Sequence, residues 1–150
     1  MERYSVLKDK NPREIVLLRG SGCKWKRCTF CDYHLDYCLD EEENYNLNAQ
    51  VLSKVTGIYN KLEVINSGSF CDLDNKTMDL IIKTCEEKNI STVHFECHYV
   101  HHKEVPALKE KFKEHNINVR IKTGVETFDV DYRENVMKKG FGKSTPEKIR

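Results

Sequence analysis

Three closely spaced cysteines constrain this chain more than any other feature of its sequence. Cys23, Cys28 and Cys31 follow the spacing C-x4-C-x2-C in the segment GSGCKWKRCTFCDYH, residues 20–34. One short loop can bring three thiolates to a common metal centre, because closing a short loop costs little entropy and thiolates bind zinc and iron–sulfur clusters. Three thiolates leave one coordination position without an obvious local ligand. The spacing therefore predicts a metal centre with an open position.

The composition limits the class of protein. Seven cysteines, in a chain whose N-terminus is too polar for a secretory signal, predict a reducing compartment and so a cytoplasmic protein. The 25 Lys and Arg residues nearly cancel the 24 Asp and Glu residues, which argues against direct binding to nucleic acid or to an anionic membrane. The apolar runs are far too short for a membrane span. With 150 residues, the chain fits one domain.

Short apolar runs alternate with segments of helical spacing along most of the chain. Such alternation is typical of an α/β fold, in which parallel strands are joined by right-handed helical crossovers. We therefore expect four βα units within residues 14–150, after a polar lead-in at residues 1–13. The expected strands are 15–18, 62–65, 92–96 and 117–122, and the expected helices are 48–59, 74–89, 103–115 and 131–139.

The unusual residues of the chain follow the expected strands. Cys23 comes after the first strand, residues 67–69 (Ser-Gly-Ser) after the second, Glu96 and His98 after the third, and Glu126 after the fourth. In parallel sheets and barrels, the loops at the carboxyl ends of the strands meet and form the active site. The four strand ends therefore predict one shared site.

Three kinds of metal centre use this cysteine spacing. With His34 as the fourth ligand, the loop would close a structural zinc site. A [2Fe–2S] cluster of the plant ferredoxin type would need a distant fourth cysteine. The third kind is a [4Fe–4S] cluster held by three cysteines, with its fourth iron open to a small molecule. The loop follows the first strand of a βα series, and this position favours the third kind.

In these features the chain resembles the radical S-adenosylmethionine (SAM) enzymes. Their three-cysteine loop follows the first strand, and Phe30 fits the aromatic position before its last cysteine, although the family's usual spacing, C-x3-C-x2-C, is one residue shorter. Residues 67–69 lie where the family has its glycine-rich SAM motif, without the usual acidic residue. GSFCD at 68–72, GVET at 124–127 and the acidic Glu96 resemble radical SAM proteins related to archaeosine synthase and to the catalytic subunit of Elongator.

The resemblance implies a partial parallel (β/α) barrel of the radical SAM type, with a [4Fe–4S] cluster and SAM as cofactors and an electron donor such as flavodoxin or ferredoxin. It implies that the catalytic cluster ligands are Cys23, Cys28 and Cys31. The residues that we expect to bind the cofactors are Phe30, Ser67, Gly68, Ser69, Glu96 and Glu126. Those that we expect to bind the substrate are Tyr33, Phe70, Asp72, His98 and Tyr99.

The segment GSGCKWKRCTFCDYHLDYC most resembles a small subgroup of clostridial radical SAM proteins that salvage queuosine. This resemblance implies a lyase that cleaves the free base queuine by way of a 5′-deoxyadenosyl radical and releases preQ1, a 7-deazaguanine with an aminomethyl arm. Two other functions stay open: a radical SAM enzyme that modifies 7-deazaguanine in tRNA, and a non-enzymatic zinc or iron–sulfur module. The balanced net charge suits a free base better than tRNA.

Three further expectations concern the rest of the chain. Residues 97–102 place three histidines beside a thiol, so a second metal site that includes Cys71 or His34 is an alternative to a substrate-lining role. Residues 144–147 have the pattern of a helix start but only three residues follow, so we expect the chain to lack the C-terminal units of its fold. The sheet edge exposed in this way predicts pairing with another chain, a homodimer being one option.

Overall fold

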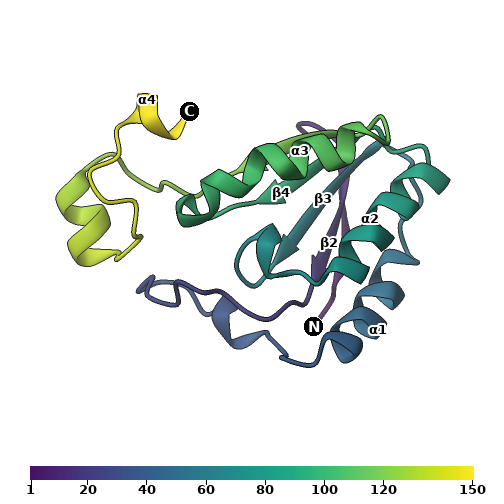
Figure 1. Ribbon diagram of the computed structural model, residues 1–150, viewed down its shortest axis with the longest axis horizontal. Helices are drawn as coiled ribbons and strands as arrows, with labels where there is room; N and C mark the ends of the chain where they lie inside the picture. Colours follow the sequence, from purple (N-terminus) through teal and green to yellow (C-terminus); the bar gives the residue numbers. More distant parts are fainter.

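A computed structural model describes all of residues 1–150. The strands are β1 (Tyr4–Leu7), β2 (Arg13–Leu18), β3 (Lys61–Asn66), β4 (Thr92–Glu96) and β5 (Asn118–Lys122). They form one sheet in the order β1-β2-β3-β4-β5, in which β2 to β5 are parallel and β1 pairs antiparallel with β2 (Figure 1). Ile15 is opposite Glu63 and Leu17 is opposite Ile65. The α/β fold and the parallel pairing of the first two apolar runs are therefore confirmed.

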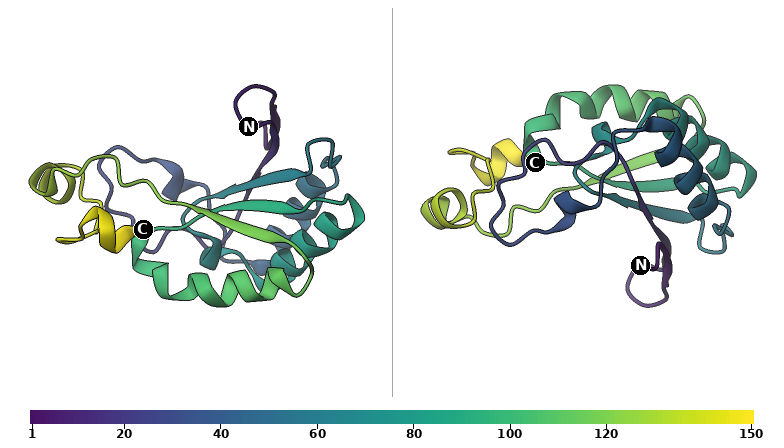
Figure 2. Two further views of the ribbon diagram at one scale, coloured as in Figure 1. Left: turned by 90° about the horizontal axis from the view of Figure 1, so that it is seen from above. Right: turned by 90° about the horizontal axis from the view of Figure 1, so that it is seen from below.

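The three longer helices cover one face of the sheet (Figure 2). They are α1 (Glu41–Leu52), α2 (Asn75–Glu87) and α3 (Val105–Lys113). The shorter elements are three 3₁₀-helices, η1 (Tyr33–Leu35), η2 (Phe70–Asp72) and η3 (Tyr99–Glu104), the π-helix η4 (Tyr132–Val136) and the terminal α4 (Pro146–Ile149). No helix in the structure has the length and apolar character needed to cross a bilayer.

One hydrophobic core fills the space between the sheet and these helices. Side chains of the central strands, such as Val64 and Phe95, are fully buried there. The expected stripe of α2 supplies Ile81, and that of α3 supplies Phe112, whose ring meets Phe95 edge-to-face at 5.3 Å between centroids. Burial of this apolar surface provides the main driving force for the arrangement of strands and helices.

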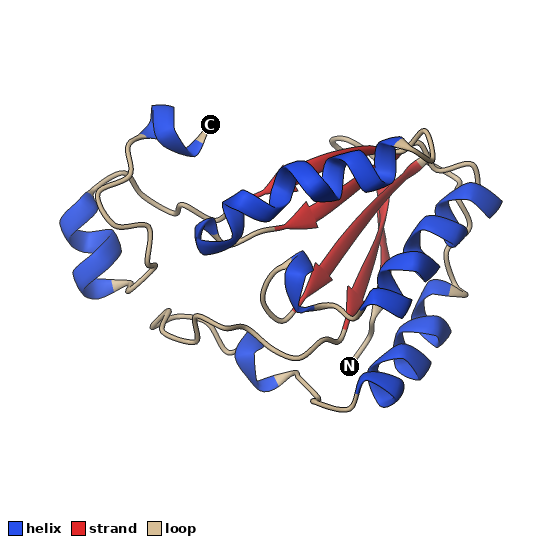
Figure 3. Cartoon of the chain, viewed as in Figure 1, coloured by secondary structure: helices blue, strands red, loops and turns tan.

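Two long segments extend past the carboxyl ends of the strands. They are residues 19–40, between β2 and α1, and residues 123–150, after β5 (Figure 3). Most of both segments is loop, and the three-cysteine cluster lies in the first. The regular sheet therefore supports a site that is built largely from irregular backbone.

The first long helix differs in position from the sequence-based expectation of residues 48–59. α1 begins at the acidic stretch, because the side chain of Asp40 accepts hydrogen bonds from two N–H groups of the first turn at 2.9 and 3.0 Å. Acidic residues in that turn also interact favourably with the helix dipole. The helix ends at Leu52, and Ile58, expected on a buried stripe, is 72 % exposed. The predicted helix at 48–59 was therefore wrong in its bounds.

Two other segments also differ from expectation. The segment expected only as a polar lead-in contains β1, which forms the antiparallel edge of the sheet. The helix expected at residues 131–139 is the short π-helix η4, which ends at Val136. Both segments have weak apolar periodicity, so their structure depends on contacts with distant parts of the chain.

The buried carboxylate of Glu14 fixes the connection between α1 and β3. It accepts hydrogen bonds from the Tyr4 hydroxyl at 2.8 Å and from the N–H groups of Thr56 at 2.7 Å and Gly57 at 2.8 Å. Burial alone would raise the pKa of Glu14, but these hydrogen bonds outweigh it and hold the pKa below its ordinary value. A carboxyl with a depressed pKa in the folded state stabilises the fold above its unfolded-state pKa. This contribution is lost as the pH falls through the folded-state pKa.

Replacing Glu14 with glutamine should lower the free energy of unfolding at neutral pH by about 1–3 kcal/mol, because a neutral amide accepts the three donors less strongly. The difference between wild type and variant should shrink as the pH falls below about 4.3, where the wild-type carboxyl also begins to lose its advantage. Urea denaturation over a pH series measures both effects. The exposed Glu2→Gln variant is the control, and a stability difference that does not vary with pH would contradict this role of Glu14.

Candidate functional site

A cavity of about 340 Å³ lies at the carboxyl ends of the parallel strands. Residues from the loops after β2, β3, β4 and β5 line it, as the positions of the unusual residues in the sequence predict. Residues 139 and 141 of the C-terminal segment complete the wall. The fold therefore brings four separate strand ends to one concave surface.

The three cysteines of the first loop all line this cavity. Cys23, Cys28 and Cys31 are free thiols, each half-buried. Burial raises the pKa of the Cys28 thiol, the nearby Lys139 ammonium lowers it, and the charges of the other two thiols raise it. Because metal binding replaces thiol protons, three thiols gathered in one cavity have the donor chemistry of an iron–sulfur cluster or a zinc ion. His34 also lines the cavity, but its Nδ1 is hydrogen-bonded at 2.9 Å to the carbonyl oxygen of Cys31.

The C-terminal segment holds the cysteine loop in place. The indole N–H of Trp25 donates to the carbonyl oxygen of Lys138 at 2.6 Å, and the hydroxyl of Thr29 donates to that of Val136 at 3.0 Å. The Trp25 ring also stacks on His98, with 5.5 Å between centroids. The two hydrogen bonds join residues more than a hundred positions apart in the sequence, so the geometry of the three thiols depends on the C-terminal segment.

The loop after β3 packs directly against the cysteine loop. Gly68 has a φ of +124°, and a Cβ there would overlap the Asp72 carboxylate and lie 3.0 Å from Cα of Cys23. The N–H of Ser69 donates to Oδ2 of Asp72 at 2.8 Å, and its hydroxyl accepts a hydrogen bond from the N–H of His98 at 2.8 Å. Glycine at position 68 therefore permits a close approach between the two loops that another residue would prevent.

Three buried polar atoms of this loop have no hydrogen-bond partner within the protein. They are Oδ1 of Asn66, Oγ of Ser67 and Oδ1 of Asp72. Buried polar groups are normally paired, so three unpaired atoms in one loop indicate a bound polar ligand beside it. The amino and carboxylate groups of an amino-acid-like ligand have the hydrogen-bonding capacity that these atoms require.

Charged groups from the later strands form the opposite wall. Burial raises the pKa of Glu96, while Lys122 and Lys139 oppose this effect. The ammonium of Lys139 lies 3.5 Å from a carboxylate oxygen of Glu126. Burial lowers the pKa of His98, which favours its neutral form. Its Nδ1 accepts a hydrogen bond from the Val100 N–H, so the proton is on Nε2, which donates to the carbonyl oxygen of Lys139. The wall thus contains carboxylates, which can bind a cationic ligand, and one neutral imidazole.

Five of the residues expected to bind cofactor or substrate line the cavity with the three cysteines: Tyr33, Gly68, Glu96, His98 and Glu126. The other six do not line it: Phe30, Ser67, Ser69, Phe70, Asp72 and Tyr99. The roles of all eleven stay predictions.

Each of these six has an evident place in the structure. Phe70 lies in the hydrophobic core, and Tyr99 stacks on His102 and Phe141. Phe30 is 52 % exposed and lines a second hollow, which shares Cys31 and Tyr33 with the cavity. Ser67, Ser69 and Asp72 are buried in the loop after β3, in contact with lining residues.

Sequence reasoning missed several lining residues, among them Asn66, Lys139 and Phe141. Asn66 is the last residue of β3, and its position at a strand end was an available signal. Lys139 is only 7 % exposed and lies over the rings of Phe30 and Phe141 at 5.2 and 5.8 Å. No local pattern marks such a lysine, because it is buried only when the C-terminal segment folds back over the cysteine loop.

No protein-family model matches the chain, and no curated protein sequence matches it either. A solved structure does: the queuine lyase from Clostridium spiroforme, bound to SAM and queuine. That protein is 46% identical to this chain, and the two structures superpose with a TM-score of 0.93. The match covers 99% of this chain and 64% of that chain, so the chain spans somewhat less than two thirds of the length of its relative.

Proposed function

We propose that this chain cleaves free queuine and releases preQ1 in queuosine salvage. The premise is its similarity in sequence and fold to a queuine lyase, which is a radical SAM enzyme. The observation that carries the proposal is the single cavity that three free thiols line together with Asn66, whose buried amide oxygen is unpaired, and the carboxylates of Glu96 and Glu126. The relative binds both SAM and queuine.

The residues present fit the two cofactors. Cys23, Cys28 and Cys31 would hold a [4Fe–4S] cluster through three of its irons, leaving the fourth for the amino and carboxylate groups of SAM. The unpaired amide oxygen of Asn66, which lines the cavity, would accept a hydrogen bond from the SAM ammonium group. When bound, the cluster and SAM would supply the one-electron chemistry that removes a hydrogen atom from the substrate. An electron donor of the flavodoxin or ferredoxin class would supply the electron.

The remaining wall suits a deazapurine base. The carboxylates of Glu96 and Glu126 would accept hydrogen bonds from the N–H edge or the amine of queuine. The ring of Phe141 and the neutral imidazole of His98 offer flat surfaces for stacking. Lys139 closes this side and carries the positive charge that balances Glu126. The chain's own contribution is therefore to hold, orient and shield the base beside the cofactors.

The test is to reconstitute the protein anaerobically with iron and sulfide and then add SAM, a reductant and queuine. We expect methionine, 5′-deoxyadenosine and preQ1 in equal amounts by mass spectrometry. A parallel reaction with queuosine-containing tRNA should give no modified product, because the balanced charge of the surface does not favour phosphates. Cleavage of SAM without preQ1 would reject the substrate. Uptake of zinc alone, with no iron and no SAM cleavage, would reject radical chemistry.

A further inference from the structure

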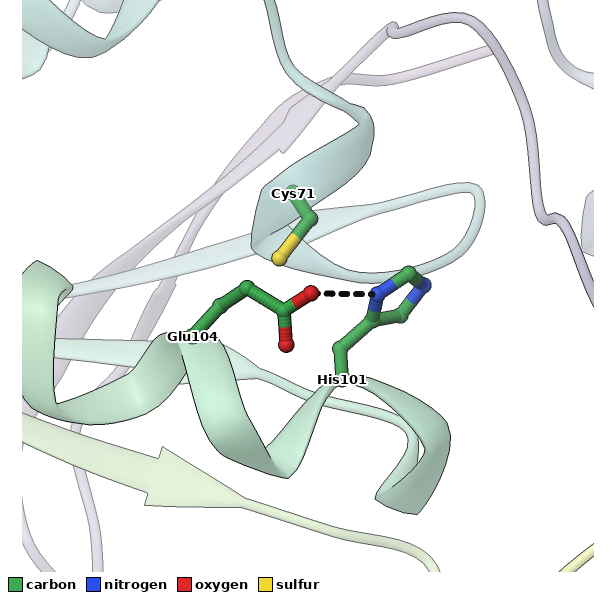
Figure 4. Close-up of side chains that lie close together, drawn as sticks. All are labelled: Cys71, His101 and Glu104. Carbon is green, nitrogen blue, oxygen red and sulfur yellow. Dashed lines mark ion pairs between the residues drawn. The ribbon is translucent and has the colours of Figure 1, made fainter.

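A second group of metal-ligating side chains lies outside the cluster loop. The thiol of Cys71, the imidazole of His101 and the carboxylate of Glu104 converge, and their ligand atoms all lie within 4.8 Å of one another (Figure 4). Cys71 comes from η2, after β3, whereas His101 and Glu104 come from η3, after β4. Figure 4 shows all three side chains pointing into the space between these two short helices.

The local fold explains why two of these ligands share one face. A 3₁₀-helix has three residues per turn, so positions i and i+3 are eclipsed. His101 and Glu104 have this spacing in η3, and both project toward η2. A short helix that faces a thiol thus provides two ligands from one turn, while the sheet fixes the separation of the two loops.

The three groups lack the partners that a purely structural role would provide. His101 is only 7 % exposed, yet the nearest charged atom to its Nδ1 is a Glu104 oxygen at 3.9 Å, which is too far for a hydrogen bond. Without a hydrogen bond to the protein at this nitrogen, the imidazole keeps a lone pair that can bind a metal ion. Asp72 adds a second, buried carboxylate next to Cys71, with one oxygen unpaired. The surroundings therefore favour a cation.

We propose that Cys71, His101 and Glu104 form a zinc site that joins the loop after β3 to the loop after β4. Thiolate, imidazole and carboxylate are the three ligand types that zinc uses in proteins, whereas magnesium and calcium take oxygen ligands. Nothing in this proposal depends on the cluster or on queuine, because none of its ligands lines the cavity that holds Cys23, Cys28 and Cys31.

The position of the site gives it a function in shaping the cavity. Cys97 lies between the two regions: it lines the cavity, and burial, followed by the nearby charges of Cys71 and Glu104, raises its pKa. An ion bound at Cys71, His101 and Glu104 would fix the start of η3 and, with it, the wall formed by residues 96–98. The zinc would thus hold the cavity wall from behind without touching the substrate.

The test uses the full chain with Cys23, Cys28 and Cys31 all replaced by serine, so that zinc cannot occupy the cluster loop. After equilibration with zinc and removal of the excess, elemental analysis should find about one zinc ion per chain. Cobalt added in place of zinc should give a thiolate-to-cobalt charge-transfer band. Adding Glu104→Gln or His101→Gln should reduce zinc affinity at least about tenfold. Because Glu104 is exposed, its substitution should leave folding intact.

Matched controls lie close by in the structure. His102→Gln changes the neighbouring histidine, which is exposed and hydrogen-bonded to the Tyr99 carbonyl oxygen, and Glu110→Gln changes an exposed carboxylate on α3. Both should keep full zinc binding. The proposal is overturned if the triple-serine chain binds no zinc, if Glu104→Gln and Glu110→Gln bind it equally, or if the cobalt band survives Cys71→Ser.

Discussion

Replacing Cys28 with alanine should abolish preQ1 formation, a larger effect than the roughly 10–100-fold loss typical of removing an outer-shell partner of a metal site. The reason is that the cluster depends on three thiols of one loop. The two thiols that remain in the variant cannot hold a cluster that has one defined open iron. Cys28 is close enough to Lys139 and to the other two cysteines for their charges to act on its thiol. Iron content, the visible absorption of the cluster and 5′-deoxyadenosine formation measure the loss at three successive steps.

The control for this prediction is Cys38→Ala, which removes a cysteine from the same long segment. Cys38 does not line the cavity, and its thiol lies 3.5 Å from a carboxylate oxygen of Glu43 at the start of α1. Iron content and activity should stay at wild-type levels in this variant. If Cys28→Ala instead retains its iron and still cleaves SAM, the assignment of the cluster to this loop is incorrect, whatever the substrate.

The sheet could be predicted from the sequence because its strands are short, continuous apolar runs. Consecutive residues of the central strands β3 and β4 are buried, which keeps this signal, and the runs at 62–65 and 92–96 agree with these strands to within a residue. α1 was placed incorrectly because the first part of its buried face consists of Asn44 and Asn48, and the aliphatic Val51 and Leu52 follow only at its end. Those two asparagines bond to the backbone and side chain of Arg19, a role that periodicity does not reveal.

The site could be predicted in part, for a related reason. Residues that immediately follow strands, such as Cys23, Gly68 and Glu96, were identified because parallel topology alone brings strand ends together. Lys139 and Phe141 were not identified, because their positions depend on how a loop of weak periodicity folds back over the sheet. Local pattern therefore predicts the part of the cavity made by the sheet and misses the part made by the C-terminal segment.

Replacing Arg133 with methionine should destabilise this C-terminal segment by about 3–5 kcal/mol, the cost of removing one partner from a buried charged network. Arg133 is fully buried and donates to Glu134 at 2.9 Å and to the carbonyl oxygens of Gly142 and Ser144 at 3.0 and 3.2 Å. Glu134 in turn accepts from two backbone N–H groups, so the substitution removes the donor that joins this carboxylate to the carbonyl oxygens of Gly142 and Ser144.

The effect should extend to the cluster, because this same segment binds the cysteine loop through Trp25 and Thr29. Arg133→Met should therefore lower both the urea midpoint and the iron retained after reconstitution, and the amide hydrogens of residues 140 and 141 should exchange faster. Arg120→Met, the same change at an exposed position on β5, should alter none of these. A lower midpoint with full iron retention would mean that the cysteine loop keeps its geometry without the segment. An unchanged midpoint would mean that the buried arginine does not stabilise it.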